Sequence, residues 1–448
     1  MRRKIYDKML RWKQESNGRT TLLIEGPRRV RKSWICREFG QREYESLIFV
    51  DFNEEGESFA EDFNAFRGDL DGLFFFLQSY YNTRLVERKS LIVLDEIQKN
   101  PKAREMLKYL VQDGRYDYIE TGSLVSIQSA VASITIPSEE VPLELGPMDF
   151  EEFLWACGDE IIYSAARRAF EERRQVGQSL HRRLMTRLRQ YMVVGGMPQA
   201  VEAFVQTNSM EEVDRIKKAI IHLYRQDIGK AGTVPRARRI FDLIPSELSR
   251  DEKRFRYSDI AKGGGLQDND DAFAWLSDAG LVNLCCNSSD PNVGLRLSMD
   301  RQRLKCYMCD TGLLVTLAFD DNEEARAGIM RSLATGKLGV NKGMLMENLV
   351  AQLLRASGRR LYYYSSYDKG NAANRMEVDF LITKNDMTNL HNICPIEVKS
   401  GPRYTLSSIR KYKEKFSQYT STAYVLHTGD LELEDDFVFL PLYMALLL

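Results

Sequence analysis

A glycine-lysine-serine loop that directly follows a short apolar run is the feature that most constrains the fold of this chain. Residues 21–34 read TLLIEGPRRVRKSW. They match the phosphate-binding loop G-x-x-x-x-G-K-[ST] at Gly26, Lys32 and Ser33, whereas Arg31 stands where the second glycine is expected. Such a loop binds phosphate with backbone N–H groups at the N-terminus of the helix that follows a strand. The match therefore predicts an α/β fold that begins with a strand, this loop and a helix.

The first 150 residues continue as an alternation of apolar segments and stretches with helical periodicity. The further apolar segments read SLIFVDFNE, SLIVLDEIQ and YDYIETGS. Strands that alternate with helices predict a parallel sheet covered by helices on both faces. Ligands of such sheets bind beyond the carboxyl ends of the strands, which is where Gly26, Asp95 and Ser123 fall. The sequence therefore predicts a nucleotide site at this edge of the sheet.

The residue types at this edge suit ATP and Mg²⁺. Lys32 would reach the β- and γ-phosphates, and Ser33 and Asp95 would hold the metal. Glu96, which follows in LIVLDE, would orient or deprotonate the attacking water. Thr121 or Ser123 would sense the γ-phosphate from the neighbouring strand. The alternative is a basic turn beside an ordinary strand end, but the strand contexts and the order of the two motifs favour the nucleotide site.

Arg31 replaces a glycine that normally lets the backbone approach the phosphates closely. The arginine side chain would either clash there or point outward and add positive charge near the phosphates. Trp34, directly after Ser33, belongs to the same expected nucleotide-binding set. We expect ATP binding to survive the change at Arg31 in weakened form, and ATP turnover stays open.

Residues 151–235 are expected to form a helical lid. Within it, residues 166–190 are densely basic and read ARRAFEERRQVGQSLHRRLMTRLRQ. These arginines either face nucleic acid or belong to solvated helices and pair with acidic groups. Glu171 and Glu172 interrupt the positive charge, which favours the second interpretation.

Residues 236–305 are expected to form a winged-helix-like connector, with three short helices and a strand hairpin. In a DNA-binding version the third helix would enter the major groove. That helix, DAFAWLSDAG, starts with Asp270 and Asp271 and carries no basic residue. The composition therefore favours a structural role or a protein partner for this region over readout of a DNA sequence.

Residues 306–448 contain a second candidate active site. A helix that carries Glu347 is followed by a strand, by RMEVDFLIT with Asp379, and by CPIEVKSG with Glu397 and Lys399. Residues 397 and 399 face the same side of a strand, because side chains alternate along it. Asp379, Glu397 and the helix Glu347 would hold Mg²⁺, with the Val398 carbonyl as a further oxygen ligand. Lys399 would orient or activate the attacking water. The alternative is a strand pair with surface charges, or an inactive relic of a nuclease.

Several motifs together resemble a prokaryotic family of AAA-superfamily P-loop ATPases with a C-terminal PD-(D/E)xK nuclease-like domain. They are GPRRVRKS, LIVLDEIQKNP, ETGS, LELGPMDFEEFL, YMVVGGMPQAV, LYRQDIGK, WLSDAGLV, CDTGLL and IEVKSG, and they cover nearly the whole chain. Members of the family usually carry G-K-T-T at the loop, so Arg31 and Trp34 are departures. The resemblance implies an α/β multidomain architecture with a P-loop sheet at 1–150, a lid at 151–235, a winged-helix-like region at 236–305 and a restriction-endonuclease-like domain at 306–448.

Composition limits the other functions that this chain can have. The 63 basic and 64 acidic residues nearly cancel, so any surface for DNA must be local. No apolar run approaches the roughly 20 residues of a membrane span, and the odd number of cysteines fits reduced thiols. We therefore expect a cytoplasmic, Mg²⁺-dependent ATPase coupled to a DNA-binding nuclease-like domain. The alternative is a nucleotide-switched module that binds DNA or protein with little or no turnover.

Overall fold

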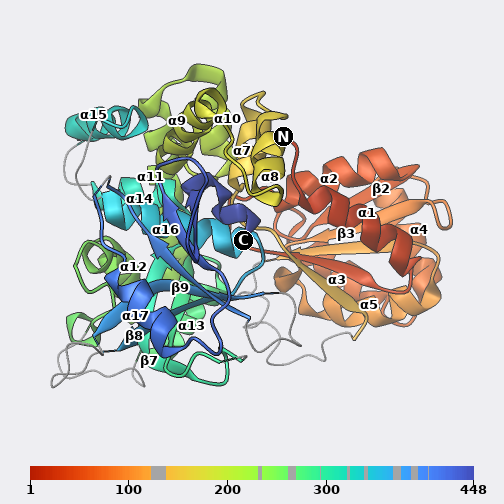
Figure 1. The fold of residues 1–448 in the computed structure, drawn as a ribbon. Coiled ribbons are helices and arrows are strands. Elements are labelled where there is room, and N and C mark those ends of the chain that lie inside the picture. Colours follow the sequence, from red (N-terminus) through yellow and green to blue (C-terminus); the bar gives the residue numbers. More distant parts are fainter. Residues whose placement is uncertain are drawn as a thin grey trace. The chain divides into compact units, whose positions relative to one another are not determined.

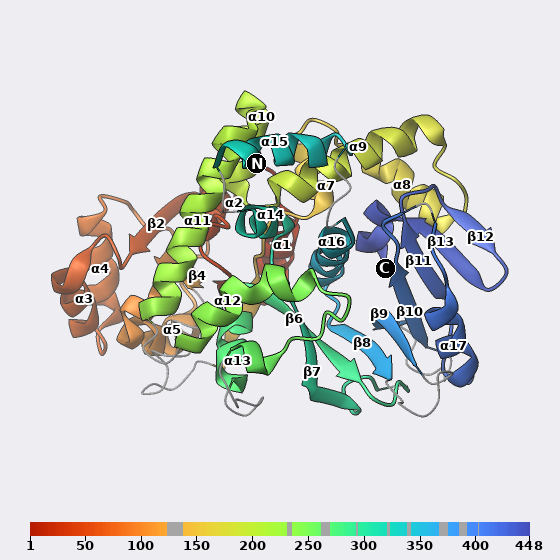
Figure 2. The same cartoon turned by 90° about the vertical axis from the view of Figure 1, so that its left-hand side faces the viewer.

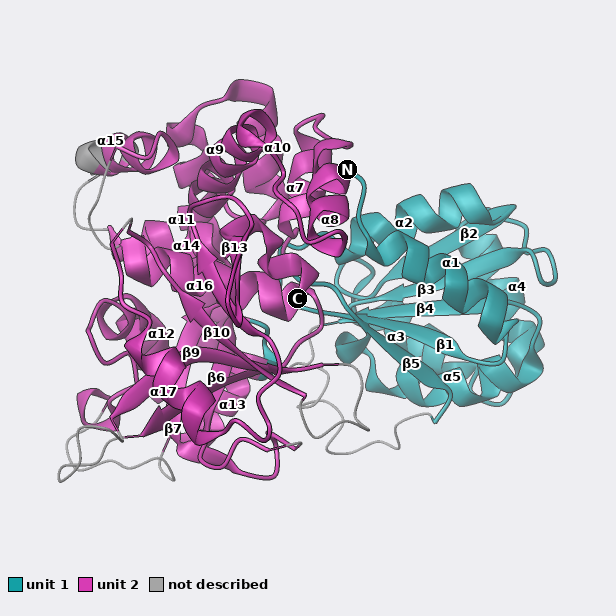
Figure 3. Ribbon diagram, viewed as in Figure 1, with its two compact units in different colours: residues 1–146, 278–280 teal, residues 147–277, 281–448 magenta. Residues whose placement is uncertain are grey.

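The computed structural model divides the chain into two compact units (Figures 1 and 2). The first contains Met1–Gly146 and Asp278–Gly280, and the second contains Pro147–Ser277 and Leu281–Leu448 (Figure 3). The structure describes residues 1–122, 138–230, 235–260, 269–292, 294–319, 323–337, 342–366, 375–384, 392–401 and 403–448. No helix within these ranges is long and apolar enough to cross a membrane.

The first unit is built on a parallel sheet with the strand order β2-β3-β4-β1-β5. The strands are β1 (Thr21–Glu25), β2 (Ser46–Asp51), β3 (Ser90–Asp95), β4 (Asp117–Gly122) and β5 (Glu140–Glu144). The predicted parallel sheet is thus confirmed. All residues of the two central strands β3 and β4 are buried, as expected where helices cover both faces of a sheet.

Helices flank this sheet on opposite sides (Figure 1). They are α1 (Ile5–Ser16), α2 (Lys32–Glu43), α3 (Gly56–Ala65), α4 (Leu70–Tyr80) and α5 (Pro101–Asp113). Apolar residues of α3, α4 and α5 pack with those of β2 and β3 in one core. The local sequence sets the ends of α5. Asn100 caps the N-terminus of the helix by accepting a hydrogen bond from Ala103 N, and Pro101 lies in the first helical turn. Gly114 ends the helix in a left-handed conformation with a φ of 74°.

The second unit contains a mixed sheet with the strand order β12-β13-β11-β10-β9-β8-β6-β7. Its strands are β6 (Val282–Ser288), β7 (Met299–Met308), β8 (Leu361–Ser366), β9 (Met376–Thr383), β10 (Ile393–Val398), β11 (Ala423–His427), β12 (Glu432–Glu434) and β13 (Phe437–Pro441). The helix α16 (Lys342–Ala356) packs against β6, β7, β8 and β10 (Figure 2). Tyr412 of α17 (Ser407–Lys415) packs with Met376 and Val378 of β9.

The remaining elements of this unit are helical. They are α7 (Phe150–Ala156), α8 (Ile162–Glu171), α9 (Gln178–Val194), α10 (Pro198–Thr207), α11 (Met210–Lys230), α12 (Pro235–Leu248), α13 (Asp270–Asp278), α14 (Thr311–Ala318), α15 (Glu323–Ala334) and the short 3₁₀ segments Tyr257–Asp259 and Leu442–Leu447. The helices α7 to α11 occupy the region that the sequence analysis expected to be a helical lid.

The predicted hairpin of the winged-helix region is present as β6 and β7, but it does not stand alone. The two strands pair antiparallel, and β6 also pairs in parallel with β8 from the C-terminal region. The expected border at residue 305 therefore falls within β7, inside a continuous sheet. An isolated hairpin would leave unpaired backbone groups along its edge, and pairing with β8 satisfies those of β6. Pairing between such distant segments leaves no local signal in the sequence.

Two glycine-containing motifs hold the second unit together around Asp310. This buried carboxylate caps α14 by accepting a hydrogen bond from Leu313 N at 2.9 Å, and it also accepts one from Gly196 N at 2.5 Å. A Cβ atom at Gly312 would lie 2.5 Å from Gly195 N, so a side chain there would force the two backbones apart. The motifs YMVVGGMPQAV and CDTGLL thus meet in the fold, and their glycines permit that close approach.

Candidate functional sites

The candidate phosphate loop lies between β1 and α2, as its motif predicts. β1 ends at Glu25, and α2 begins at Lys32. Gly26 has a φ of 150°, and a Cβ atom added there would lie 2.1 Å from the carbonyl oxygen of Leu145. Only glycine fits a backbone that passes this close to another segment. The first glycine of the motif is therefore required by the fold of the loop itself.

Arg31 has a backbone conformation that favours glycine. It has φ 70° and ψ 43°, in the left-handed region, and it precedes the first residue of α2. Its carbonyl oxygen accepts a hydrogen bond from Ile35 N at 3.1 Å, which closes the first turn of the helix. A left-handed conformation costs a non-glycine residue roughly 1–2 kcal/mol. The loop therefore carries backbone strain at Arg31.

Lys32 is folded back onto the loop. Its ammonium group donates hydrogen bonds to the carbonyl oxygens of Gly26 at 2.8 Å and Pro27 at 3.1 Å. Burial lowers the pKa of Lys32, while the nearby carboxylates of Glu96 and Asp95 act to raise it. The positive charge therefore lies at the centre of the loop, where a phosphate group would interact with it directly.

Asp95 joins three elements at the carboxyl end of the sheet. Strand β4 lies between β1 and β3, and the register pairs Ile24 of β1 with Thr121 of β4. The Thr121 hydroxyl donates a hydrogen bond to Asp95, and the Ser33 hydroxyl from the first turn of α2 also bonds to that carboxylate. Burial raises the pKa of Asp95, and these two hydrogen bonds act against that rise. The expected metal-binding pair is therefore in direct contact.

Glu96, Trp34 and Ser123 complete the predicted set. Glu96 has a φ of 54°, its backbone N–H points at Thr121 Oγ1 at 3.4 Å, and its carboxylate accepts a hydrogen bond from Gln98. Trp34 is half-buried in the first turn of α2. Ser123 lies outside the residues that the structure describes.

The oxygen donors at this edge fit Mg²⁺. A hydroxyl and a carboxylate converge at Ser33 and Asp95, and Mg²⁺ takes oxygen ligands, commonly a carboxylate together with phosphate oxygens. Burial raises the pKa of Asp95, because it disfavours the charged form of the carboxylate. A divalent cation would favour that charged form.

The second candidate site brings together Asp379, Glu397 and Lys399. Strands β9 and β10 pair antiparallel, and Ile396 lies opposite Phe380, so Glu397 and Asp379 follow at adjacent positions. Asp379 accepts a hydrogen bond from Val398 N at 2.8 Å, and Lys399 Nζ lies 2.6 Å from Glu397 Oε1. Asp379, Glu397 and Lys399 therefore lie close together, as the alternation of side chains along the two strands predicts.

Asp379 and Glu397 both have a raised pKa, although each carboxylate has a lysine ammonium group nearby. Burial, followed by repulsion from Glu347, raises the pKa of Asp379 to about 6. Burial, followed by repulsion from Asp379, raises the pKa of Glu397 to about 8. The second oxygen of Glu397, Oε2, is buried and has no hydrogen-bond partner. These two carboxylates fit one Mg²⁺ ion, although the described residues contain no set of three or more carboxylate, imidazole or thiol groups arranged around an ion.

Glu347, the third expected ligand of this metal, already has three protein partners. It lies on α16 with its side chain buried, and it accepts hydrogen bonds from Lys253, from Tyr307 and, at 3.3 Å, from Lys305. Burial alone would raise the pKa of Glu347, but Lys305 and Lys253 lower it to about 2. The carboxylate therefore has its charge satisfied by the protein.

Sequence reasoning missed both lysines. Lys253 and Lys305 are 94 and 42 residues away from Glu347. They lie in the region expected to form the winged-helix-like connector. One signal was available, because Lys305 stands beside the apolar run CYM in the second half of a strand. A lysine in such a position is rarely buried without a charged partner.

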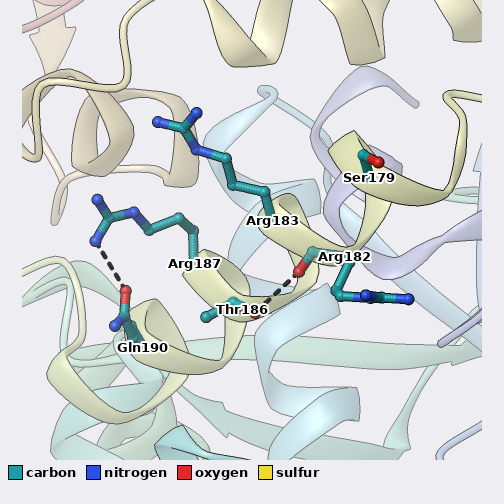
Figure 4. Close-up of a pocket in the computed structure, with 6 residues that line it drawn as sticks. All are labelled: Ser179, Arg182, Arg183, Thr186, Arg187 and Gln190. Carbon is teal, nitrogen blue, oxygen red and sulfur yellow. Dashed lines mark hydrogen bonds between the residues drawn. The ribbon is translucent and has the colours of Figure 1, made fainter.

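The basic helix α9 lines a surface hollow of about 390 Å³ (Figure 4). The hollow is lined by Ser179, Arg182, Arg183, Thr186, Arg187 and Gln190. Arg183 and Arg187 both form ion pairs with the buried carboxylate of Asp159. Elsewhere in the same basic stretch, Arg168 and Arg174 pair with Glu172. These pairs agree with the interpretation of the stretch as solvated helices with internal ion pairs.

Comparison with protein families gives three matches along the chain. A family model described as an AAA domain matches residues 18–154. Two models described as domains of unknown function match residues 185–324 (DUF8612) and 342–445 (DUF4143). None of the curated proteins compared with the chain matches it. Residues 18–154 therefore match an AAA domain, and this match supports the expectation of a P-loop nucleotide site in the first region.

Solved structures include one that is similar over a long stretch of sequence. It is the Orc1 protein of Aeropyrum pernix in complex with DNA, at 13% sequence identity over 73% of this chain and 94% of that chain, with a TM-score of 0.28.

Proposed function

We propose that this chain is a Mg²⁺-dependent ATPase whose nucleotide state controls a nuclease-like, DNA-binding C-terminal region. The observation that carries the ATPase part is the contact of Asp95 with the hydroxyls of Ser33 and Thr121. That contact joins the phosphate loop, the strand that ends in Asp95 and the strand between them. The AAA-domain match over residues 18–154 supports the same part.

In this proposal each residue at the carboxyl edge has one task. Backbone N–H groups after Gly26 and the ammonium of Lys32 bind the phosphates, and Ser33 and Asp95 hold the metal. Glu96 orients the attacking water. Mg²⁺ held by Ser33 and Asp95 would supply positive charge to the β- and γ-phosphates.

Arg31, Trp34 and Ser123 complete the proposed nucleotide site. Arg31 and Trp34 flank the phosphates from the two ends of the Lys32–Ser33 pair. Ser123 follows the strand that carries Thr121, and either hydroxyl would report the state of the γ-phosphate.

The proposed division of the chain follows the sequence analysis. Residues 1–150 bind nucleotide, 151–235 form a lid, 236–305 form a winged-helix-like connector that contacts a protein partner, and 306–448 form the nuclease-like domain. The order of α16, β8, β9 and β10 supports the last assignment, as does the cluster of Asp379, Glu397 and Lys399. A Mg²⁺ ion held by Asp379 and Glu397 would polarise a scissile phosphate, and Lys399 would orient the attacking water.

A second candidate function is a nucleotide-switched binding protein with little turnover. Arg31 favours it, because its side chain leaves the loop at a position where the phosphates need close backbone approach. In that case ATP would hold one state of the protein and its slow hydrolysis would release it.

Calorimetric titration of Mg·ATP into the full chain tests the proposal. Lys32→Ala removes the proposed phosphate ligand, and Lys102→Ala removes an exposed lysine of α5 as a matched control. We expect saturable binding by the wild type and by Lys102→Ala, and none by Lys32→Ala. Equal binding by all three proteins would show that the phosphate loop is not the nucleotide site. Steady-state phosphate release then separates the ATPase from the switch.

A further inference from the structure

One lysine lies among three carboxylates beside the candidate metal site. Lys305, on β7, is fully buried. Its ammonium nitrogen lies 2.7 Å from Glu377 Oε1, 3.3 Å from Glu347 Oε1 and 3.9 Å from Asp379 Oδ1. The three acids come from two different elements, α16 and β9. They therefore converge on a single positive charge, which a third element, β7, supplies.

The acids reach this point because of strand alternation. Met376 and Val378 of β9 pack with Tyr412 on one face of the sheet. Glu377 and Asp379 therefore project to the opposite face, where they meet Lys305. Glu347 approaches the same ammonium from α16, and the Tyr307 hydroxyl donates to Glu347 as well.

A second lysine adds to this arrangement. Lys253 forms an ion pair with Glu347, and its side chain is 19% exposed. Glu347 and Glu377 are therefore each paired with at least one ammonium group. Lys399 is paired with Glu397. When all groups are ionised, the net charge is one negative unit. The groups counted are the carboxylates of Glu347, Glu377, Asp379 and Glu397 and the ammonium groups of Lys253, Lys305 and Lys399. The acids nearest to Lys305 therefore hold little uncompensated charge.

The ammonium of Lys305 is surrounded by negative charge. Its nitrogen lies within ion-pair distance of Glu347, Glu377 and Asp379, and these carboxylates favour its charged form. A buried ammonium is tolerated only where it is paired and hydrogen-bonded, and this one has carboxylate partners on two elements. It is therefore a permanent component of the site.

The carboxylates of Glu347, Glu377, Asp379 and Glu397 together form what we call the acidic site. We propose that the Lys305 ammonium group takes the place of a second divalent metal ion in this site. In sites with two metal ions, the two ions lie about 3.5–4 Å apart. Here Lys305 occupies the point where Glu347, Glu377 and Asp379 meet. One divalent ion can then bind, at Asp379 and Glu397, and that part of the inference rests on the function proposed above. Glu347 anchors Lys253 and Lys305 and does not bind the ion.

Removal of the Lys305 charge tests this role. In Lys305→Met, the three carboxylates would face one another without a cation, and such oxygen clusters bind Mn²⁺, Mg²⁺ and Ca²⁺. Lys305→Gln removes the charge but keeps an N–H donor for Glu377, so it is the milder variant. Lys384→Met, an exposed position just after β9, is the matched control.

The measurement is Mn²⁺ binding to the nucleotide-free full chain, by calorimetry and by electron paramagnetic resonance. We expect both Lys305 variants to bind one Mn²⁺ ion more per chain than the wild type and Lys384→Met do. We also expect Mn²⁺ to raise the unfolding midpoint of the Lys305 variants more than that of the wild type. An unchanged number of ions and an unchanged midpoint in both variants would overturn the proposal.

The increment in bound ions separates this inference from the proposed function. If the wild type binds no ion near Asp379 and Glu397 but Lys305→Met binds one, the proposed metal site of the wild type at these two residues is wrong. The proposed role of Lys305 would still stand. If neither Lys305 variant folds, Lys253→Met takes their place, since its side chain reaches the surface. It removes one of the two cations from Glu347 and should raise the Mn²⁺ affinity about tenfold, because the bound ion would no longer be repelled by a neighbouring positive charge. An unchanged affinity would then count against the proposal.

Discussion

The carboxylate of Asp310 accepts a hydrogen bond from the backbone N–H of Gly196, 114 positions earlier in the chain, at 2.5 Å. The same carboxylate accepts from Leu313 N and from the Gln352 amide at 3.2 Å. Three segments that are far apart in the sequence therefore share one buried acceptor.

Asp310→Ala should destabilise the second unit strongly. The change leaves the buried N–H groups of Gly196 and Leu313 without an acceptor, at a cost of about 3–4 kcal/mol in the free energy of unfolding. Asp310→Asn keeps one carbonyl acceptor and should lose clearly less. Urea unfolding followed by circular dichroism compares the three proteins, and equal midpoints for the alanine variant and the wild type would contradict this role.

Lys217 should make the stability of the protein depend on pH in the alkaline range. It is buried in α11, and it donates hydrogen bonds to the carbonyl oxygens of Val193 at 2.6 Å and Gly312 at 3.1 Å. Burial lowers the pKa of Lys217 to about 8, although Asp214 and Asp310 act to raise it. In the unfolded chain the pKa is about 10.4.

Between these two values the unfolded state binds more protons than the folded state, so stability rises with pH. The wild type should gain about 2–3 kcal/mol relative to Lys217→Met from about pH 7 to about pH 10. Thermal unfolding of both proteins across this range measures the difference, which cancels the titration of other groups. Parallel pH profiles for the two proteins would mean that Lys217 does not titrate there.

Arg31→Gly should tighten ATP binding about threefold to tenfold, because the glycine lets the backbone approach the phosphates and removes the strain of a left-handed arginine. Arg29→Gly is a matched control, because Arg29 has the same φ of 70° but lies outside the consensus positions of the motif. Titration with Mg·ATP should show tighter binding for the first variant alone. Unchanged or weaker ATP binding by Arg31→Gly would contradict the interpretation that Arg31 weakens nucleotide binding at the loop.

Asp379→Ala should reduce Mg²⁺-dependent DNA cleavage at least about a hundredfold, and Lys399→Ala should do the same, since each removes one part of the proposed site. Neither change touches the phosphate loop, so both variants should bind ATP like the wild type. Glu434→Ala, at an exposed position of β12, is the control. Full cleavage by Asp379→Ala would point to another site or to a contaminating nuclease.

The sequence predicted those features that depend on neighbouring residues. The phosphate loop needs only a strand, a glycine and a helix start within a dozen residues, and β1, Gly26 and α2 supply them. The approach of Glu397 to Asp379 follows from the side-chain alternation of two strands with a short connection. Patterns of this kind are visible within one segment.

Features that depend on pairing between distant segments were not predictable. The hairpin of β6 and β7 looked complete, and its addition to β8 changed the extent of the C-terminal sheet. Lys305 approaches Glu347 because β7 packs against α16, and the segment of Lys253 is joined to β7 by the hydrogen bond from Phe255 N to Leu304 O. No spacing rule connects residues 253, 305 and 347, so the cations of the acidic site appear only with the fold.

The meeting of the two glycine motifs also limits how this polypeptide can be divided. A fragment that ended before residue 310 would retain α9 to α11 but lose the acceptor for Gly196 and the carbonyl partner that Gly312 offers to Lys217. A fragment that began after α11 would keep Asp310 without the N–H group that it accepts from. We therefore expect the helices and the large sheet to unfold in one cooperative transition, and proteolytic fragments cut between them to remain associated.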